Sequence, residues 1–233
     1  MNHVNKQKGF TLIELLLAMT FISVLLLAIA MTIIQIGAIY NRGLTLKEVN
    51  QTGRSLSSEL ERGISQTVPF LIDGSAASHY KVQGTWGGRL CLGQYSYIWN
   101  YGKAINAKDP LSLNVYNSTS TKPIRFIKVP DANAAYCADT SKSIDPTSAI
   151  ELLNVGDHSL AVHGFSIKSA VTANDDKTVQ RLYAISLTLG TNDTKALLDD
   201  ASSCKTPGVD GADPAYCAVQ RFDFTARAGN IVN

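Results

Sequence analysis

Glu14 is the residue whose position in this sequence most directly suggests chemistry. It is the only charged residue between Gly9 and Tyr40, in an otherwise apolar run. An ionised carboxylate inside a transmembrane helix costs about 2.5–3.5 kcal/mol on insertion scales, so we expect a neutralising partner. A positive group at the same depth on a neighbouring copy would serve, such as a free N-terminal amine exposed by proteolysis just upstream. Glu14 therefore predicts ion pairing between chains.

The cysteines are the second set of reactive side chains in the sequence, and they are Cys91, Cys137, Cys204 and Cys217. No C-x-x-C spacing occurs, so the pattern favours disulfides over a zinc site or free buried thiols. Oxidation of all of them allows three pairings. We expect Cys91 with Cys137 and Cys204 with Cys217, because the second pair closes a compact loop. That loop, KTPGVDGADPAY, is rich in glycine, proline and aspartate, has little packing of its own and would gain from a disulfide.

Aspartates gather around the same loop and raise the question of a calcium site. Asp199 and Asp200 precede Cys204, whereas Asp210 and Asp213 lie within the loop. Calcium takes about six to eight oxygen ligands at set spacings, and no D-x-D-x-D-G run is present. A solvated acidic loop is therefore the preferred interpretation, with Asp210 and Asp213 as weak calcium candidates.

An aromatic residue stands at every second position from 95 to 101: Tyr95, Tyr97, Trp99 and Tyr101. In a strand these side chains would all point to one side. If that side were exposed, it would be a binding face for partners, glycans or surfaces. The preferred alternative is that the rings pack under a loop or against a helix, with their hydroxyls reaching water at the edge.

The run that carries Glu14 is long enough for a membrane-spanning helix, which needs about 20 apolar residues. A cleavable secretory signal has an apolar core of about 7–15 residues and fits poorly. A plain signal anchor fits the length, but explains neither Glu14 nor the glycine before Phe10. No proline occurs from residue 10 to residue 68, so we predict one continuous helix that Pro69 ends.

The second half of this helix is predicted to be amphipathic. Apolar residues recur there at helical spacing, which gives one stripe that can lie against a globular head. Its members are Leu46, Val49, Leu56, Leu60 and Ile64. We therefore divide the chain into a polar leader at residues 1–9, a membrane half at 10–40, an amphipathic half at 41–68 and a head at 69–233.

The head is predicted to be rich in β-structure. Residues 179–189 alternate between apolar and polar side chains, which is typical of a strand with one buried and one wet face. Further strands are expected at residues 90–101, 124–129, 160–168 and 215–225. The fold class is thus α+β, with the stripe of the long helix packed on an antiparallel sheet of four or more strands.

The sequence around Glu14 resembles a known processing motif. Residues 8–14 read KGFTLIE, and this stretch with the helix behind it is similar to the N-terminus of type IV prepilins and type II secretion pseudopilins. The resemblance implies cleavage by prepilin peptidase between Gly9 and Phe10, N-methylation of Phe10, and pairing of Glu14 with the Phe10 amine of an adjacent subunit. The loop closed by Cys204 and Cys217 also resembles the cysteine-bounded C-terminal loop of many pilins.

The same resemblance implies partners and a location. The partners are other pilin or pseudopilin subunits bound through the N-terminal helix, prepilin peptidase and an inner-membrane assembly platform. The protein would be stored in the cytoplasmic membrane with its head exported, and would then enter a surface pilus or a pseudopilus. The front helix lacks the prolines of many major pilins, which favours a minor subunit similar to the PilW-like minor pilins or the J-type pseudopilins.

Composition supports no other class of function. The net charge is +2 with 17% charged residues, so nucleic acid stays only as an alternative partner. No constellation of nucleophile, base and orienting group stands out, and no cofactor motif is present. We expect a non-enzymatic subunit without a cofactor. The opposed alternative is an exported enzyme or receptor domain on a signal anchor.

Overall fold

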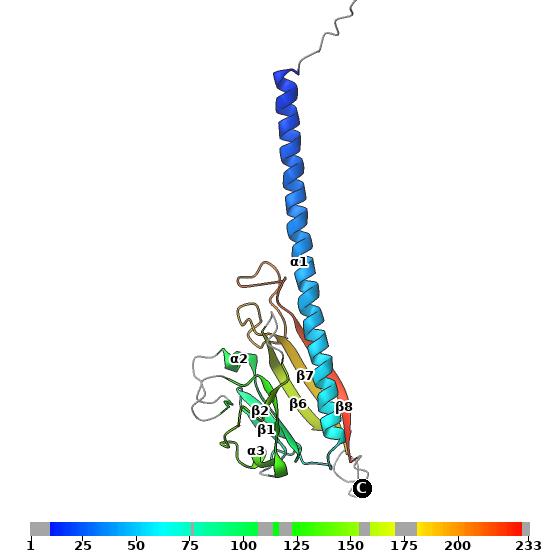
Figure 1. Ribbon diagram of the computed structural model, residues 1–233, viewed down its shortest axis with the longest axis vertical. Helices are drawn as coiled ribbons and strands as arrows, with labels where there is room; N and C mark the ends of the chain where they lie inside the picture. Colours follow the sequence, from blue (N-terminus) through cyan, green and yellow to red (C-terminus); the bar gives the residue numbers. More distant parts are fainter. Residues whose placement is uncertain are drawn as a thin grey trace, which may run out of the picture. The chain divides into compact units, whose positions relative to one another are not determined.

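A computed structural model describes residues 10–75, 77–106, 114–116, 123–153, 159–170 and 181–229. It consists of one long helix and two antiparallel sheets (Figure 1), which is the α+β pilin-like architecture that the sequence predicted. The chain divides into two compact units, Met1–Asn41 and Arg42–Asn233. The first unit contains the front of the helix, and the second contains its rear turns together with the head.

Helix α1 spans Leu12–Ser65, close to the predicted range of 10–68. Every residue from 10 to 40 is exposed in the single chain, although nearly all of them are apolar. Hydroxyl groups in this part bond back to the helix: Thr20 donates to the Leu17 carbonyl and Thr32 to the Ala28 carbonyl. These bonds satisfy the side chains without a partner outside the helix.

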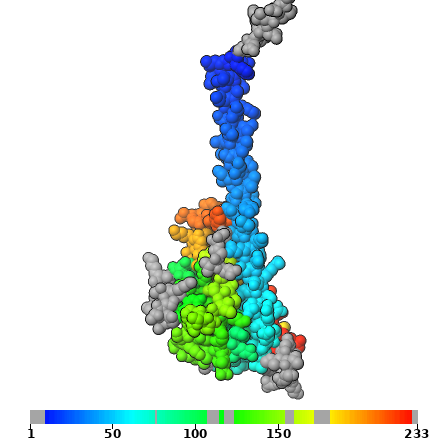
Figure 2. Space-filling model, viewed as in Figure 1, coloured from blue at the N-terminus to red at the C-terminus, as the bar shows by residue number. Residues whose placement is uncertain are grey.

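The rear turns of α1 bury one stripe against the head: Thr45, Val49, Gly53, Leu56, Leu60 and Ile64. In the space-filling view, these cyan turns lie directly against the green and yellow-green surface of the head (Figure 2). Two members of the stripe, Thr45 and Gly53, were not predicted. A side chain at Gly53 would displace the ring of Phe222, which lies 2.1 Å from an added Cβ.

The head contains two sheets. The first has the order β1 (Tyr80–Gln83), β2 (Gly87–Cys91), β3 (Tyr95–Asn100), β4 (Phe126–Pro130) and β5 (Ile150–Glu151). The second joins β6 (Leu160–Ser169), β7 (Arg181–Thr191) and β8 (Val219–Ala228). Short helical turns occur at α2 (Gly102–Ile105), η2 (Ala132–Ala134) and α3 (Ala135–Ala138).

The strand predicted over residues 90–101 is wrong in one respect, because the chain reverses within it. Gly93 has a φ of 86°, a left-handed conformation that favours glycine, and β2 and β3 pair as a hairpin around it. The single predicted sheet is also divided. An isolated bridge joins Tyr101 to Val162 where the first sheet meets β6. The alternation of residues 179–189 fits β7, which the structure describes from Arg181 onward.

The predicted aromatic face lies mostly inside the head. Tyr97 and Trp99 are fully buried, and the Trp99 ring centroid lies 4.4 Å from that of Phe165 and 5.7 Å from that of Phe126. Tyr95, at the strand's start, is 42% exposed, and the Lys128 ammonium lies 4.2 Å above its ring centroid. Tyr97 and Trp99 therefore belong to the core that includes the α1 stripe, with Tyr101 packed against it, as the preferred interpretation predicted. The alternative of an exposed aromatic binding face is wrong for these rings.

Candidate functional site

The candidate assembly site is the beginning of α1, where Thr11 and Glu14 form a reciprocal pair. The Glu14 Oε2 atom accepts hydrogen bonds from the Thr11 backbone N–H at 2.9 Å and from its hydroxyl at 2.8 Å. The Thr11 Oγ1 atom in turn accepts the Glu14 backbone N–H at 3.3 Å. This arrangement is a capping box, which satisfies orphan donors at a helix start. Phe10 precedes it and is 88% exposed, whereas Gly9 lies outside the described residues.

The capping box changes the physical description of Glu14. Sequence reasoning treated its carboxylate as unpartnered until another chain arrives. In the structure, one carboxylate oxygen already holds two donors of its own helix. Neither donor carries a charge, however, so a cation from outside the helix remains the natural partner for this carboxylate in an apolar environment.

The position of Glu14 along the membrane normal can be inferred from the polar residues that follow it on α1. After Glu14, the first side chain polar enough to lie at a membrane surface is the amide of Gln35, and Tyr40 comes after it. The apolar residues between Glu14 and Gln35 match the thickness of a hydrocarbon core, about 30 Å or about 20 residues. Among the described residues, α1 is the one helix long and apolar enough to cross a membrane. If this segment spans the bilayer, Glu14 lies near one edge of the hydrocarbon core and Gln35 near the other, with Tyr40 beyond it.

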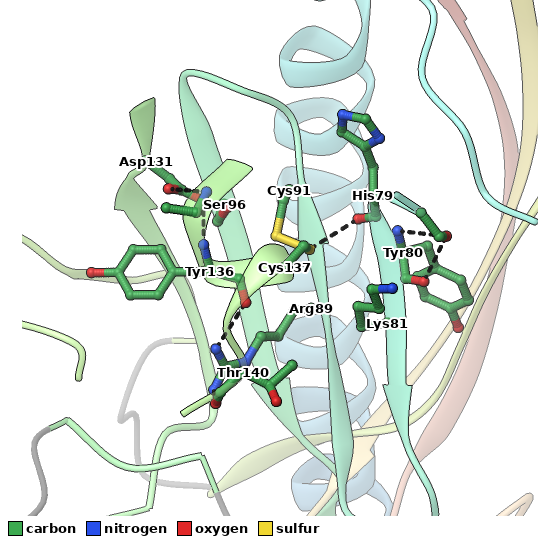
Figure 3. The surroundings of a disulfide bond; sticks show 12 residues. His79, Tyr80, Lys81, Arg89, Cys91, Ser96, Asp131, Tyr136, Cys137 and Thr140 are labelled. Atoms are coloured by element: carbon green, nitrogen blue, oxygen red, sulfur yellow. Dashed lines mark hydrogen bonds between the residues drawn. A yellow bond between two sulfur atoms is a disulfide. The ribbon is translucent and has the colours of Figure 1, made fainter. Parts of the chain in front are cut away.

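The disulfides are the pairs that the sequence suggested, Cys91 with Cys137 and Cys204 with Cys217. The first joins the end of β2 to α3 (Figure 3), and its Cys137 sulfur lies 3.3 Å from the His79 carbonyl oxygen. That approach is a contact, because an oxidised sulfur has no proton to donate. The second bond closes the loop between β7 and β8, where Cys217 lies in a small core with Leu197.

Arg89 on β2 supports the segment that the first disulfide anchors, although it is 3% exposed. Its guanidinium donates to the Asn114 Oδ1 atom at 2.9 Å, the Tyr136 carbonyl at 2.9 Å and the Thr140 carbonyl at 2.6 Å. Figure 3 shows the Arg89 guanidinium beside Tyr136 of α3 and beside Thr140, which follows α3. Asp131 caps the same segment by accepting the Ala135 backbone N–H at 2.8 Å. These groups hold the structure of this segment.

The weak calcium candidates act as turn formers. The Asp213 Oδ1 atom accepts the Ala215 and Tyr216 backbone N–H groups, and the Asp210 carbonyl accepts the Lys205 ammonium. Asp200 makes a similar turn with Ser202. Among the described residues, no group of three or more potential ligands comes together to hold a metal ion. The candidate residues are thus not assembled into a site.

One polar contact ties the rear of α1 to the first sheet. The Glu59 Oε1 atom lies 2.7 Å from the Lys128 ammonium and accepts the Tyr97 hydroxyl at 3.2 Å. Burial acts to raise the pKa of Glu59, but the hydrogen bonds and the charge of Lys128 outweigh it and lower the pKa. Gly63, one turn further along α1, leaves room for the Tyr97 hydroxyl, which would lie 2.4 Å from an added Cβ.

Buried His163 on β6 is expected to make the head less stable as the pH falls from 7 toward 5. Its Nε2 lies 3.0 Å from the Thr191 carbonyl, whereas its Nδ1 is buried without a hydrogen-bond partner among the described residues. Burial lowers the pKa of His163, and the Thr191 hydrogen bond only partly opposes this. Below about pH 6.5 the imidazole is therefore protonated in the unfolded chain but stays neutral in the folded head. The free energy of unfolding then falls by up to about 1.4 kcal/mol per pH unit.

Denaturant unfolding at pH 7 and pH 5 measures this loss, with His163→Gln as the comparison, because glutamine keeps a donor for Thr191 and does not titrate. The variant is expected to lose less stability between the two pH values than the wild type. The comparison is needed because Glu151 acts in the opposite direction: burial raises its pKa, so it stabilises the fold as the pH falls toward 4.5. Equal losses in both proteins would contradict this role of His163.

Sequence reasoning missed Thr11, Arg89 and Asp131. A signal for the first was present, since T-x-x-E directly before an apolar run is the signature of a capping box. Nothing in the local sequence distinguishes Arg89 or Asp131 from a surface charge. Their partners lie up to 51 residues away and meet them only in the folded head.

The comparison with protein families bears on the beginning of the chain. Residues 4–34 match the family described as prokaryotic N-terminal methylation motif, and this range includes the KGFTLIE stretch, the Thr11–Glu14 capping box and most of the exposed apolar part of α1. Neither the curated proteins nor the solved structures gave a significant match. A prepilin-type motif thus leads into a long helix and an antiparallel head. The chain thus carries the class III N-terminal signal of type IV pilin-like proteins at residues 4–34, ahead of a pilin-like fold.

Proposed function

We propose that this protein is a minor, non-enzymatic subunit of a type IV filament. Prepilin peptidase would cleave it between Gly9 and Phe10 and methylate the new amine. The subunit would wait in the cytoplasmic membrane with its head exported, and would then be extracted into a surface pilus or a related pseudopilus. The observation that carries this proposal is the match of residues 4–34 to the N-terminal methylation motif.

The exposure of the front helix supports the proposal on physical grounds. A helix that is apolar on all sides must be covered, either by lipid or by other helices. Residues 10–40 are exposed all round in the single chain. In a filament subunit, lipid surrounds this helix while the protein is stored in the membrane, and the front helices of neighbouring subunits surround it after assembly.

Assembly then has a defined local event at Glu14. During storage its carboxylate has the uncharged donors of Thr11. In the filament, a neighbour's Phe10 amine would add a full positive charge at a site from which water is excluded. A charge-assisted hydrogen bond is stronger than a neutral one, so this contact favours the assembled state and sets the register between subunits.

The minor role is supported by the uninterrupted α1. No proline occurs from residue 10 to residue 68, whereas many major pilins carry prolines in the front helix. Abundance separates the two roles: a major subunit dominates sheared filaments, and a minor subunit is scarce in them. Quantitative mass spectrometry of sheared filaments from the native host is expected to find this protein far below the main subunit.

The decisive experiment is the intact mass of the protein from membranes of a host with an active prepilin peptidase. The expected mass lacks residues 1–9 and carries one added methyl group on Phe10. A peptidase-deficient host is the matched control and should yield the full-length chain. Full-length protein from both hosts would refute the proposal and favour a signal-anchored head instead.

A further inference from the structure

The solvent-exposed face of the sheet formed by β6, β7 and β8 has an unusual distribution of side-chain sizes. Side chains of β7 alternate, so Tyr183, Ile185 and Leu187 are buried in the core whereas Ala184 and Ser186 point outward. The outward positions of the central strand are thus small. Longer side chains on the flanking strands rise on both sides of them.

Strand register defines the rows across this face. Ala184 is paired with Lys168 on β6 and with Thr225 on β8. The next row pairs Ser186 with Ser166 and Asp223. Because small residues form the floor and longer ones the sides, the face contains an open trough of about 340 Å³ along β7. That volume is near the lower end of the range for ligand clefts, about 300–1,000 Å³.

Cations dominate the charge of this face. Among the described residues of the three strands, the outward cations are Lys168 and Arg221, which line the trough, and Arg227 in the next row, against the carboxylate of Asp223. The Asp223 carboxylate already lies 2.9 Å from the Arg221 Nε atom, and hydrogen bonds from Ser186 and Arg221 lower the pKa of Asp223. Within the described part of the chain, no carboxylate pairs with Lys168 or Arg227. An anionic partner would therefore be complementary to the face.

The side chains that line the floor of the trough indicate which class of anion would bind there. Hydroxyls of Ser166, Ser186 and Thr225 line it, and these groups both donate and accept hydrogen bonds. Single-stranded nucleic acid is bound mainly by stacking on aromatic rings, and the nearby Phe222 and Phe224 of β8 point to the opposite face. Hydroxyl-lined surfaces with a few cations suit a polymer that carries both hydroxyl and carboxylate groups.

We propose that this trough binds an acidic polysaccharide, with one or two uronic-acid units lying along β7. Lys168 and Arg227 would contact the sugar carboxylates, and the serine and threonine hydroxyls would bond to ring hydroxyls. The inference concerns the head alone, and does not depend on cleavage at Gly9 or on filament assembly.

The test uses the full chain in detergent micelles and measures its retention on immobilised alginate, a polyuronate, at near-physiological salt. Neutral dextran and duplex DNA are the comparison polymers. Retention on alginate alone is expected. Lys168→Ala combined with Arg227→Ala is expected to weaken alginate binding about tenfold, since two exposed charge contacts contribute together about 1–2 kcal/mol.

A second variant tests the trough without changing the charge. Ala184→Tyr fills the floor at an exposed strand position and should abolish retention while leaving the fold intact. Lys47→Ala with Arg54→Ala is the matched control, because it removes two exposed cations from α1 and should retain alginate binding. No retention of the wild type, equal weakening by the control, or equal retention on DNA would each overturn the proposal.

Discussion

Glu14→Gln is expected to leave the protein inserted in the membrane and cleaved, and to remove it from filaments. Glutamine keeps the length and polarity of the side chain but has no charge to pair with a neighbour's N-terminal amine. If that pairing sets the register between subunits, its loss affects assembly and not storage. The measurement is the share of the protein in sheared filaments relative to membranes, expected to fall at least tenfold.

The choice of glutamine separates two roles that the structure assigns to Glu14. The capping box with Thr11 accepts either glutamate or glutamine at this position, so the helix start remains capped in the variant. Thr11→Val does the opposite, because it removes the capping hydroxyl and leaves the carboxylate. Thr11→Val is therefore expected to weaken the first turn by about 1 kcal/mol and to retain most of the incorporation.

Two results would contradict the charge-pairing mechanism. Normal incorporation of Glu14→Gln would show that the carboxylate charge is not needed. Equal loss in Thr11→Val and Glu14→Gln would show that the capped helix start, and not the ion pair, is what assembly requires. Intact mass of each variant confirms that cleavage and methylation have not changed.

The sequence predicted the parts of the fold that depend on local periodicity. The stripe of α1 was readable because Val49, Leu56, Leu60 and Ile64 recur at helical spacing, and all of them are buried. Thr45 and Gly53 belong to the same stripe but could not be recognised, since their burial depends on what packs over them. Gly53 looks like a weak point in an isolated helix and becomes a contact point once Phe222 lies on it.

The head shows the limit of the same reasoning. Alternation over β7 predicted a strand because one face is buried. The reversal at Gly93 was hidden because apolar residues stand on both sides of it, Leu90 and Leu92 before it and the aromatic alternation from Tyr95 after it. Alternation also cannot tell which face of a strand meets the core. Tyr97 and Trp99 share a face that could have been wet or dry, and tertiary packing against Phe126 and Phe165 decided for burial.

Arg89 illustrates a buried charge that the sequence cannot identify, and its removal should have a large effect on the head. Its guanidinium satisfies three oxygen acceptors from two separate segments. Replacement by methionine would fill most of the volume and remove the cost of burying a charge. It would also leave those acceptors without donors, at about 1–3 kcal/mol for each one that water cannot reach.

The loss of hydrogen-bond donors outweighs the gain from removing a buried charge, because Asn114 is itself only 3% exposed and its oxygen cannot bond to water instead. Arg89→Met is therefore expected to lower the unfolding free energy by about 3 kcal/mol. Arg89→Lys keeps the charge but has no planar fork to reach Asn114 and Thr140 together, so it should recover only part of the loss. Arg54→Met, at an exposed position of α1, is the control and should change stability by less than about 0.5 kcal/mol.

The Cys91–Cys137 disulfide provides a further test, because it joins the end of β2 to the same α3 segment that Arg89 holds through the Tyr136 and Thr140 carbonyls. Groups that hold one segment are expected to be coupled. Denaturant unfolding of the full chain should show a larger cost of Arg89→Met when both cysteines are replaced by serine than when the disulfide is present. Additive losses would instead mean that the guanidinium and the disulfide stabilise the segment independently. A loss of stability in Arg89→Met no greater than that in Arg54→Met would mean that water replaces the guanidinium as hydrogen-bond donor.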